Sequence, residues 1–334
     1  MEWALIGAST IAKDYVINAI RAQDGHSVRT VMSSSAARGA EYAEAQGIPQ
    51  SETDLDAILA DPSVGAVYIS TTNEKHFPQA MAAIAAGKHV LCEKPLAMTL
   101  EDAVTMVKAA EAAGNTFATN HHLRCSGSHR AIRDVVAEGR IGRVLSMRIF
   151  HAVHLPPHLQ GWRINDAGAG GGVIPDITVH DADVTRFILG EDPVNVVAQM
   201  AASGMGSGVE DSAMSVWSMP SGAMVMTHES FTHPFAGSGL EVHGTEGSIF
   251  ASGIMTQQPV GEITLVNEDG RTALPYSNHD LYVQGLADFS GAIRGEGQPA
   301  GTGWDGVKSL AIAHAVRKSA ETGARVPVNY GGAA

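Results

Sequence analysis

Short apolar runs alternate with helical patterns over about the first 120 residues, and this alternation restricts the fold more than any other feature. Each run stops at a small or polar residue, and a helix-length segment separates most of them. The runs are 4–6, 28–32, 64–70, 89–92 and 117–120. Buried strands joined by helices form a parallel sheet with helices on both faces. Residues 1–121 are therefore predicted to form an α/β domain with a mostly parallel, doubly wound sheet.

The pattern changes in the second part of the chain, 122–334. Helices are expected at about 127–138 and 171–189, with a long strand at 144–153 between them. Alternating runs with Gly or Pro turns follow from 194 to about 265 and are typical of antiparallel strands. Helical patterns return at 281–293 and 304–321. This part is predicted to be an α+β domain with an open, mainly antiparallel sheet.

Composition excludes several classes of protein. The 334 residues are 44% hydrophobic and carry a formal charge of −13, which disfavours nucleic acid or an anionic membrane as partner. Only two cysteines, Cys92 and Cys125, are present, so no disulfide framework is expected. The N-terminus shows no export signal, and no window of about 20 apolar residues occurs. We expect a protein of the cytoplasm with no membrane span.

The first strand ends in a glycine turn, Gly7-Ala8-Ser9-Thr10-Ile11-Ala12. In a dinucleotide-binding Rossmann fold such a turn lets backbone N–H groups and a helix N-terminus face a pyrophosphate. The usual pattern is G-x-G-x-x-G/A, and here Ser9 replaces the middle glycine. An ordinary strand-to-helix turn is the alternative, but the surrounding strand–helix alternation favours a dinucleotide. Gly7, Ser9, Thr10 and Ile11 are the predicted pyrophosphate contacts.

The end of the second strand predicts which dinucleotide binds. Sites for NAD(H) usually carry Asp or Glu here, to bind the ribose 2′-hydroxyl. This chain has Ser33-Ser34-Ser35, followed by Arg38. Hydroxyls and a guanidinium suit a 2′-phosphate, so the sequence favours NADP(H). The alternative is that Arg38 is a solvated charge on a helix face.

Fifteen histidines raise the question of a metal site. The dense groups are His121-His122 and His151, His154 and His158. Their spacing matches no zinc motif, and no Cys or carboxylate completes an obvious ligand set. No catalytic metal is expected.

Several ordered motifs resemble the glucose–fructose oxidoreductase / inositol dehydrogenase / rhizopine-catabolism family. The strongest is Glu93-Lys94-Pro95 directly after a strand. The other motifs are Thr71-Thr72-Asn73-Glu74-Lys75-His76, Gly161-Trp162-Arg163, and Gly170-Gly171-Gly172 with Asp176 and His180. The resemblance runs from about residue 2 to 320. Within the family, the motifs imply NADPH-dependent reduction of the 2-keto group of 1,5-anhydro-D-fructose to 1,5-anhydro-D-mannitol.

The resemblance implies roles for the catalytic residues. Lys94, at a strand end where α/β sheets bind ligands, would polarise a substrate oxygen. Asp176 and His180 share a helix face at i and i+4, and His180 can give a proton near neutral pH. Asp176 would bind substrate hydroxyls or orient His180. The alternatives are a solvated lysine and a structural Asp–His pair.

The resemblance also implies a binding surface around these three residues. Expected cofactor contacts are Thr71, Thr72, Asn73, His76, Glu93, Lys94, Asn120, Trp162, Arg163 and Tyr282. Expected substrate contacts are His151, Trp162, Arg163, Asp176 and His180. For Tyr282 a core or surface position is the alternative. The open sheet of the second domain is a common interface for self-association in this family.

Two other functions stay open at this stage. One is an NAD-dependent dehydrogenase of another cyclic sugar or polyol, which the missing acidic residue after the second strand disfavours. The other is a sugar or dinucleotide sensor without catalysis, which the intact Lys94, Asp176 and His180 disfavour.

Overall fold

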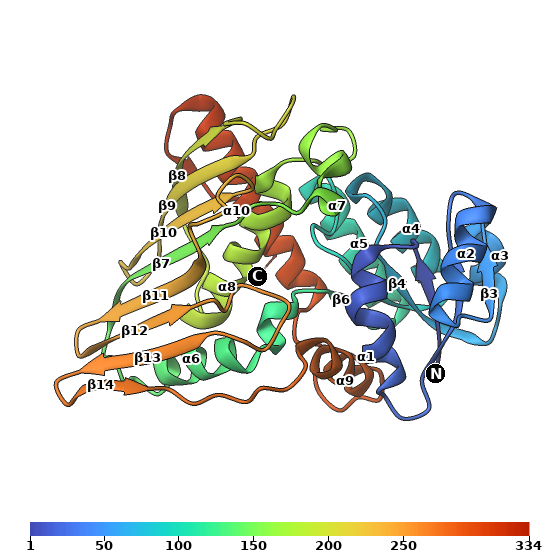
Figure 1. Cartoon of the computed structure of the whole chain (residues 1–334), viewed down its shortest axis with the longest axis horizontal. Helices are drawn as coiled ribbons and strands as arrows, with labels where there is room; N and C mark the ends of the chain where they lie inside the picture. The colour runs from blue at the N-terminus through green and yellow to red at the C-terminus, as the bar shows by residue number, and fades with distance from the viewer. Residues whose placement is uncertain (334) are drawn as a thin grey trace. The chain divides into compact units, whose positions relative to one another are not determined.

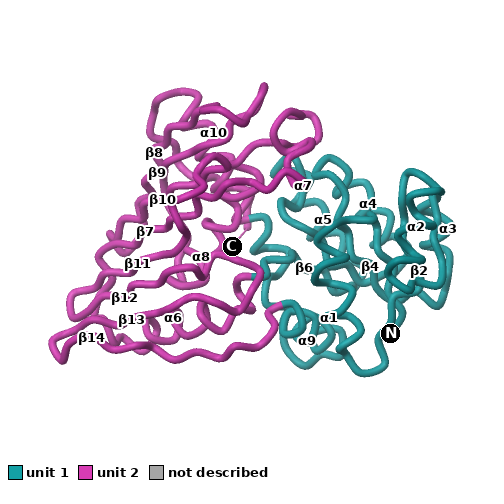
Figure 2. Tube along the Cα trace, in the orientation of Figure 1, with its two compact units in different colours: residues 1–122, 282–307 teal, residues 123–281, 308–334 magenta. Residues whose placement is uncertain are grey.

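The computed structural model describes residues 1–333, which form two compact units (Figures 1 and 2). Unit 1 contains residues 1–122 and 282–307, and unit 2 contains residues 123–281 and the chain from Lys308 onward. The predicted division of the chain into domains 1–121 and 122–334 stays a prediction. By spatial contact, unit 1 is built from two separate stretches of chain.

Unit 1 holds a six-stranded parallel sheet in the order β3-β2-β1-β4-β5-β6. This is the order of dinucleotide-binding folds, in which chain direction across the sheet reverses beside β1. The strands are β1 Glu2–Ile6, β2 Ser27–Met32, β3 Gln50–Glu52, β4 Val64–Ile69, β5 His89–Cys92 and β6 Phe117–Thr119. The predicted parallel sheet is confirmed. The short β3 carries no apolar pattern and was not predicted.

Helices alternate with these strands and end where the sequence predicts. Thr99 caps α5 by accepting a hydrogen bond from the amide of Asp102, and Gly114 ends it in the left-handed conformation. The helical segments are η1 Ala12–Val16, α1 Ile17–Arg21, α2 Ala36–Gln46, α3 Leu55–Ala60, α4 Asn73–Ala85, α5 Leu100–Ala113 and α9 Leu281–Ile293. The segment η1 is a π-helical turn, a local geometry that no sequence period revealed.

The returning segment completes the core of unit 1. Phe289 on α9 packs against Trp3 on β1 with ring centroids 5.5 Å apart, and both side chains are 0% exposed. Thr302 forms an antiparallel bridge with Ala118 at the β6 edge of the sheet. Burying each of the two aromatic rings contributes about 1.5–3 kcal/mol.

Unit 2 is built on a nine-stranded sheet in the order β14-β13-β12-β11-β7-β10-β9-β8-β15. Among the described strands of this sheet only β7 and β10 pair in parallel, so the expected mainly antiparallel sheet is confirmed. The strands are β7 Val144–Ala152, β8 Asn195–Ala201, β9 Ser212–Ser218, β10 Met224–Ser230, β11 Ser238–Gly244, β12 Gly247–Ser252, β13 Glu262–Asn267, β14 Gly270–Ala273 and β15 Val326–Pro327.

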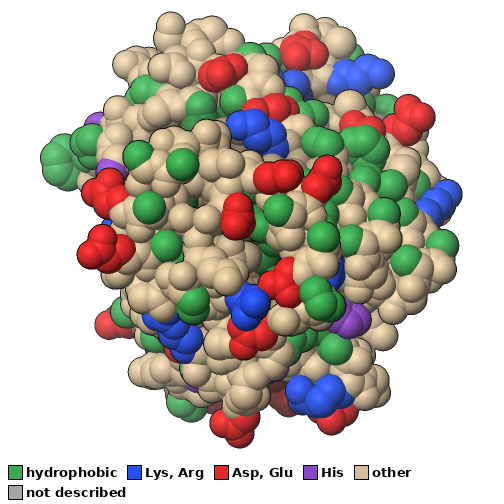
Figure 3. Space-filling view, turned by 90° about the vertical axis from the view of Figure 1, so that its right-hand side faces the viewer, with side chains coloured by type: hydrophobic (Ala, Val, Ile, Leu, Met, Phe, Trp, Pro, Cys, Tyr) green, Lys and Arg blue, Asp and Glu red, His purple; other side chains and the backbone are tan. Residues whose placement is uncertain are grey.

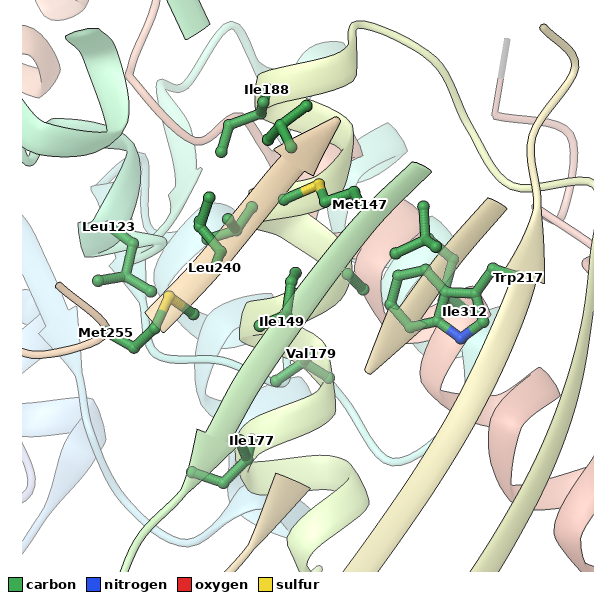
Figure 4. Packing of buried hydrophobic residues seen from close by; sticks show 14 of the residues in the cluster. Leu123, Met147, Ile149, Ile177, Val179, Ile188, Trp217, Leu240, Met255 and Ile312 are labelled. Carbon is green, nitrogen blue, oxygen red and sulfur yellow. The ribbon is translucent and has the colours of Figure 1, made fainter. Parts of the chain in front are cut away.

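Helices cover the inner face of this sheet. Figure 4 shows Ile149 of β7 near Val179, and Trp217 of β9 beside Ile312. The hydroxyl of Ser319 also accepts a hydrogen bond from the amide of Ala198 on β8. The helical segments are η2 His122–Cys125, α6 Gly127–Ala137, α7 Pro157–Gln160, η3 Gly161–Ile164, η4 Ile174–Thr178, α8 Val179–Leu189 and α10 Gly303–Thr322.

The helix expected at 171–189 begins later and in another geometry. Its first turn, η4, is π-helical and α8 continues from it, so Asp176 lies on the π turn and His180 on the α-helix. A π turn is frequently found at functional sites. The assumed α-helical spacing of this pair is therefore corrected.

Within residues 1–333 no helix is long and apolar enough to cross a membrane. Figure 3 shows one face of the molecule, on which acidic and basic side chains lie interspersed with apolar ones.

Candidate functional site

The glycine turn after β1 is tightly packed. Gly7 has φ +117°, and a Cβ there would lie 3.1 Å from the backbone carbonyl of Ser70, so glycine is required. Ser9 uses its hydroxyl within the turn, since it accepts from the amide of Ala12 at 3.2 Å and lies 2.8 Å from the hydroxyl of Ser70. Thr10 begins the helical segment that continues into η1. The turn thus has the form that brings backbone amides close to a phosphate.

The end of β2 and the start of α2 lie against this turn. Ser33 is 5% exposed, whereas Ser34 and Arg38 are exposed. A guanidinium nitrogen of Arg38 donates to the carbonyl oxygen of Ala8 at 2.8 Å. Arg38 is therefore held at the glycine turn, which argues against the alternative of a solvated charge.

His76 ties two loops of unit 1 together. It is 0% exposed, with Nδ1 2.8 Å from the carbonyl oxygen of Pro95 and Nε2 3.2 Å from that of Thr71. Burial lowers the pKa of His76 despite these two acceptors. The hydroxyl of Thr71 donates to Gln79 at 2.7 Å, and that of Thr72 lies 2.8 Å from Glu74. Asn73 begins α4 beside them and is buried.

Glu93 joins the ends of three neighbouring strands. Its Oε1 accepts from the hydroxyl of Tyr68 at 2.5 Å and from the amide of Asn120 at 2.6 Å. Lys94 follows directly, and the Lys94–Pro95 peptide is cis. Sequence analysis missed Tyr68, because a tyrosine inside an apolar strand gives no sign that its hydroxyl reaches the next strand.

Tyr282 is packed inside unit 1. Its ring stacks on Tyr15 at a centroid distance of 4.9 Å and on His122 at 5.4 Å, and the residue is 2% exposed. This position favours the alternative of a core tyrosine over a direct cofactor contact.

In unit 2, a glycine stretch and the ion pair between Glu210 and Arg317 fix the start of the helix that carries Asp176 and His180. Gly172 has φ +116°, and a Cβ there would lie 2.4 Å from Glu210 Oε1. Glu210 accepts from the amide of Ile174 at 3.1 Å and from Arg317 at 2.8 Å. The glycines were identified from the sequence, but the contacts of Glu210 with Ile174 and Arg317 were not, because these residues are distant in sequence.

Arg163 holds Asp176 from the side. Its Nε lies 3.4 Å from Oδ2 of Asp176, and its guanidinium lies over the ring of Trp162 at 4.7 Å. The cation–π contact restricts both side chains. The predicted substrate residues Trp162, Arg163 and Asp176 therefore form one connected group.

His151 lies at the end of β7, close to His180. The two rings have centroids 6.2 Å apart, and His151 is 7% exposed. Nδ1 of His151 lies 2.8 Å from Oδ1 of Asp181, which is fully buried. Sequence analysis did not single out Asp181, although a carboxylate next to His180 was a visible signal.

The described residues contain no group of three or more His, Cys, Asp or Glu side chains that could hold a metal ion. Each unit thus brings one set of predicted residues together: the glycine turn, Arg38, His76 and Glu93-Lys94 in unit 1, and His151, Arg163, Asp176 and His180 in unit 2.

The sheet order of unit 1 and its glycine turn define a dinucleotide-binding oxidoreductase. Residues 1–121 match the family model described as "Oxidoreductase family, NAD-binding Rossmann fold", and residues 129–250 match the "GFO/IDH/MocA C-terminal domain". The chain belongs to the GFO/IDH/MocA family of oxidoreductases. The family resemblance inferred from the motifs is confirmed, as is binding of a nicotinamide dinucleotide.

Three similar proteins illustrate the relationship. A 1,5-anhydro-D-fructose reductase of Ensifer adhaerens is 56% identical over 331 residues, which cover 99% of each chain. A myo-inositol 2-dehydrogenase of Thermotoga maritima is 28% identical over 84% of this chain and 85% of its own. The aldose-aldose oxidoreductase of Caulobacter crescentus, solved with glycerol, superimposes with a TM-score of 0.89 at 26% identity, covering 98% of this chain and 99% of its own.

Proposed function

We propose that the protein reduces the 2-keto group of 1,5-anhydro-D-fructose to 1,5-anhydro-D-mannitol with NADPH. The observation that carries this proposal is the 56% identity to the Ensifer adhaerens 1,5-anhydro-D-fructose reductase over nearly the whole of both chains. The motifs that carry chemistry, Glu93-Lys94-Pro95 and Asp176 with His180, are intact.

The residues beside the glycine turn support NADPH over NADH. No carboxylate follows β2 before α2, where Ser33 and Ser34 stand instead. Arg38 lies at the same turn, anchored to Ala8. A guanidinium with two hydroxyls matches a 2′-phosphate in charge and in donors. When NADPH is bound, its nicotinamide would supply a hydride to the substrate carbon.

Protein side chains supply the proton. His180 donates a proton to the carbonyl oxygen as the carbon accepts hydride, so the ketone becomes an alcohol. Lys94 donates a hydrogen bond to the same oxygen, which polarises the carbonyl and positions it. Asp176, held by Arg163, binds substrate hydroxyls or orients His180.

The remaining contacts with cofactor and substrate are assigned to the residues of each unit in turn. In unit 1, Asn73 lines the nicotinamide side, Glu93 binds a ribose hydroxyl, and Asn120 holds Glu93 in place. The fully buried His76 supports this surface through its bonds to Thr71 and Pro95 and is not itself a cofactor contact, contrary to the prediction. In unit 2, His151, Trp162 and Arg163 form the substrate wall, with Trp162 and Arg163 also reaching the cofactor. Aromatic surface and an Arg donor suit a polyhydroxylated ring.

We also propose that a second copy of the chain covers the outer face of the nine-stranded sheet. Val197, Val216 and Met226 stand in one row across β8, β9 and β10 and are 39–46% exposed. Met214 and Met224 lie on the same strands and are 56% and 59% exposed. A contiguous apolar face of this kind marks an interface. Val216→Lys is expected to lower the molar mass measured by sedimentation, and an unchanged mass would exclude this face.

The function is tested by absorbance at 340 nm with 1,5-anhydro-D-fructose and either NADPH or NADH. Fast oxidation of NADPH with slow oxidation of NADH is expected. Oxidation of a cyclic polyol with a strong preference for NAD⁺ over NADP⁺ would instead support an inositol-type dehydrogenase. Binding of NADPH without turnover of any ketose would support a sensor.

A further inference from the structure

Three buried side chains form a line from the candidate substrate residue His151 into the interior of unit 2. Nδ1 of His151 lies 2.8 Å from Oδ1 of Asp181, and the carboxyl of Asp181 interacts electrostatically in turn with that of Glu229. Asp181 and Glu229 are both 0% exposed. None of the roles proposed above uses either carboxyl.

Three different elements bring these residues together. His151 and Glu229 face each other in register on the parallel strands β7 and β10, and both lie on the inner face of the sheet. Asp181 comes from α8, one residue after His180. The line therefore connects the sheet to the helix that carries the proposed acid.

The oxygen atoms of the two carboxyls require a shared proton. Within residues 1–333, no donor makes a well-formed hydrogen bond with Oδ2 of Asp181 or with either oxygen of Glu229. Two buried carboxylates side by side would combine the cost of desolvation with like-charge repulsion. A single proton between them removes one charge and satisfies an oxygen on each side.

The surroundings place that proton on Glu229. Burial raises the pKa of Glu229 well above its ordinary value, and the adjacent Asp181 charge raises it further. The Thr227 hydroxyl and the amide of Glu229 itself oppose this rise without cancelling it. Burial also raises the pKa of Asp181, but the neighbouring His151 opposes this rise and favours the charged form of Asp181.

We propose that Glu229 is a positioning residue: as a neutral acid it donates to Oδ2 of Asp181, whose carboxylate accepts the Nδ1–H of His151. The neutral His151 ring then carries its proton on Nδ1, and Nε2 accepts a hydrogen bond from a hydroxyl of a cyclic sugar derivative. Only the identity of that hydroxyl rests on the proposed function, because the tautomer is a property of the protein alone.

Other ionisable groups surround this line. His129 on α6 and His180 on α8 are neighbours of His151, and His228 on β10 interacts with Asp181. The test therefore compares variants at one fixed pH near 7.5, so that no difference between them arises from a change of pH.

Conservative variants distinguish the proposed hydrogen bonds, in which Glu229 and His151 both donate to Asp181, from a purely structural role of these residues. In Asp181→Asn, the oxygen of the new amide accepts from Glu229 and its nitrogen donates to Nδ1 of His151, which moves the ring proton to Nε2. Glu229→Gln keeps a donor for Asp181, whereas Glu229→Leu removes it. Ser215→Ala is the matched control, since Ser215 is buried on the same sheet face but bonds to Thr227 and Trp217.

The first readout is the nitrogen NMR spectrum of ¹⁵N-histidine-labelled protein, with His151 identified as the signal lost in His151→Gln. The wild type, Glu229→Gln and Ser215→Ala are expected to show the proton on Nδ1, and Asp181→Asn to show it on Nε2. A wild-type proton on Nε2, or no change in Asp181→Asn, would overturn the proposal. Should Glu229→Leu fail to fold, the other variants still decide.

The second readout is steady-state kinetics with 1,5-anhydro-D-fructose and NADPH. Asp181→Asn is expected to raise KM for the ketone about tenfold, equivalent to about 1.4 kcal/mol, while kcat falls less than about threefold. Glu229→Gln should stay within about twofold of wild type in both constants. If the ring proton of His151 moves to Nε2 in Asp181→Asn but KM for the ketone does not change, a hydrogen bond between His151 and a substrate hydroxyl is excluded. An inactive wild type with the expected tautomer would reject the proposed function alone.

Discussion

The phenol of Tyr68 donates to Oε1 of Glu93 at 2.5 Å, and this bond ties the centre of the parallel sheet to the residue that precedes Lys94. Tyr68 is 0% exposed, and burial together with the neighbouring Glu93 raises the pKa of its hydroxyl well above the ordinary value. The phenol is therefore a permanent donor at physiological pH. The backbone at Lys94 is thus held by the core of unit 1 as well as by its own loop.

Tyr68→Phe is expected to lower the free energy of unfolding by about 1.5–3 kcal/mol, because a hydrogen bond to a charged group is lost inside the core. Urea denaturation monitored by circular dichroism measures the change. The control is Tyr276→Phe, which removes a hydrogen bond to the neutral carbonyl of Gly261 and should cost about 0.5–1.5 kcal/mol. Equal losses in the two variants would show that the hydrogen bond to Glu93 contributes no more than one to a neutral carbonyl.

Lys94→Ala and His180→Ala are each expected to lower kcat for the ketone by about 10²–10⁴-fold, the range for loss of general acid–base catalysis. The dissociation constant for NADPH, measured by fluorescence, should change less than about threefold. Lys75→Ala and His158→Ala are matched controls, since both side chains are exposed. Near-normal turnover in either test variant would remove that residue from the mechanism.

Arg38→Ala is expected to raise KM for NADPH at least tenfold and to leave KM for NADH within about twofold, because a charge-assisted contact with the 2′-phosphate is lost. Lys108→Ala, an exposed lysine on α5, makes the same change in net charge away from the glycine turn. A parallel rise in KM for both cofactors would mean that Arg38 serves only to support the turn through Ala8.

Stability is expected to fall in mild acid because of His129. Burial lowers the pKa of His129 to about 3, so between pH 6.5 and 3 the unfolded chain binds a proton that the folded protein does not. The free energy of unfolding therefore decreases as pH falls below about 6.5, by up to about 1.4 kcal/mol per pH unit from this group. The raised pKa values of Glu229 and Asp181 act in the opposite direction.

The measurement is urea denaturation of wild type and His129→Gln between pH 7.5 and 5, where the comparison cancels the other groups. The variant should show a pH slope that is smaller by about the amount contributed by one histidine. If wild type and His129→Gln show the same pH slope, the loss of stability in acid arises from groups other than His129.

The two kinds of sheet and the alternation of strands and helices along the chain were predictable because they depend on local signals. Strand periods, the cap at Thr99 and the glycine turn at Gly7 act over a few residues. Contacts between distant segments were not predictable, as the stacking of Tyr282 on Tyr15 and the ion pair between Glu210 and Arg317 illustrate. One sequence carries no direct signal of which segments meet in space.

The Asp181–Glu229 pair lay outside prediction for a related reason. A glutamate on a strand usually faces solvent, and only the register of β10 against β7 turns Glu229 inward. Likewise, helix propensity does not predict the π geometry at Asp176, which directly follows the close packing of Gly172 against Glu210 in the chain.

The two-part construction of unit 1 has a consequence for synthesis on the ribosome. Trp3 is synthesised 286 residues before its partner Phe289. At a synthesis rate of about 5–20 residues per second, the strands of unit 1 are made roughly 15–60 s before α9, the helix that carries Phe289. During that interval an indole of the future core stays uncovered, which makes the nascent N-terminal half a natural client for chaperones that bind exposed apolar surface.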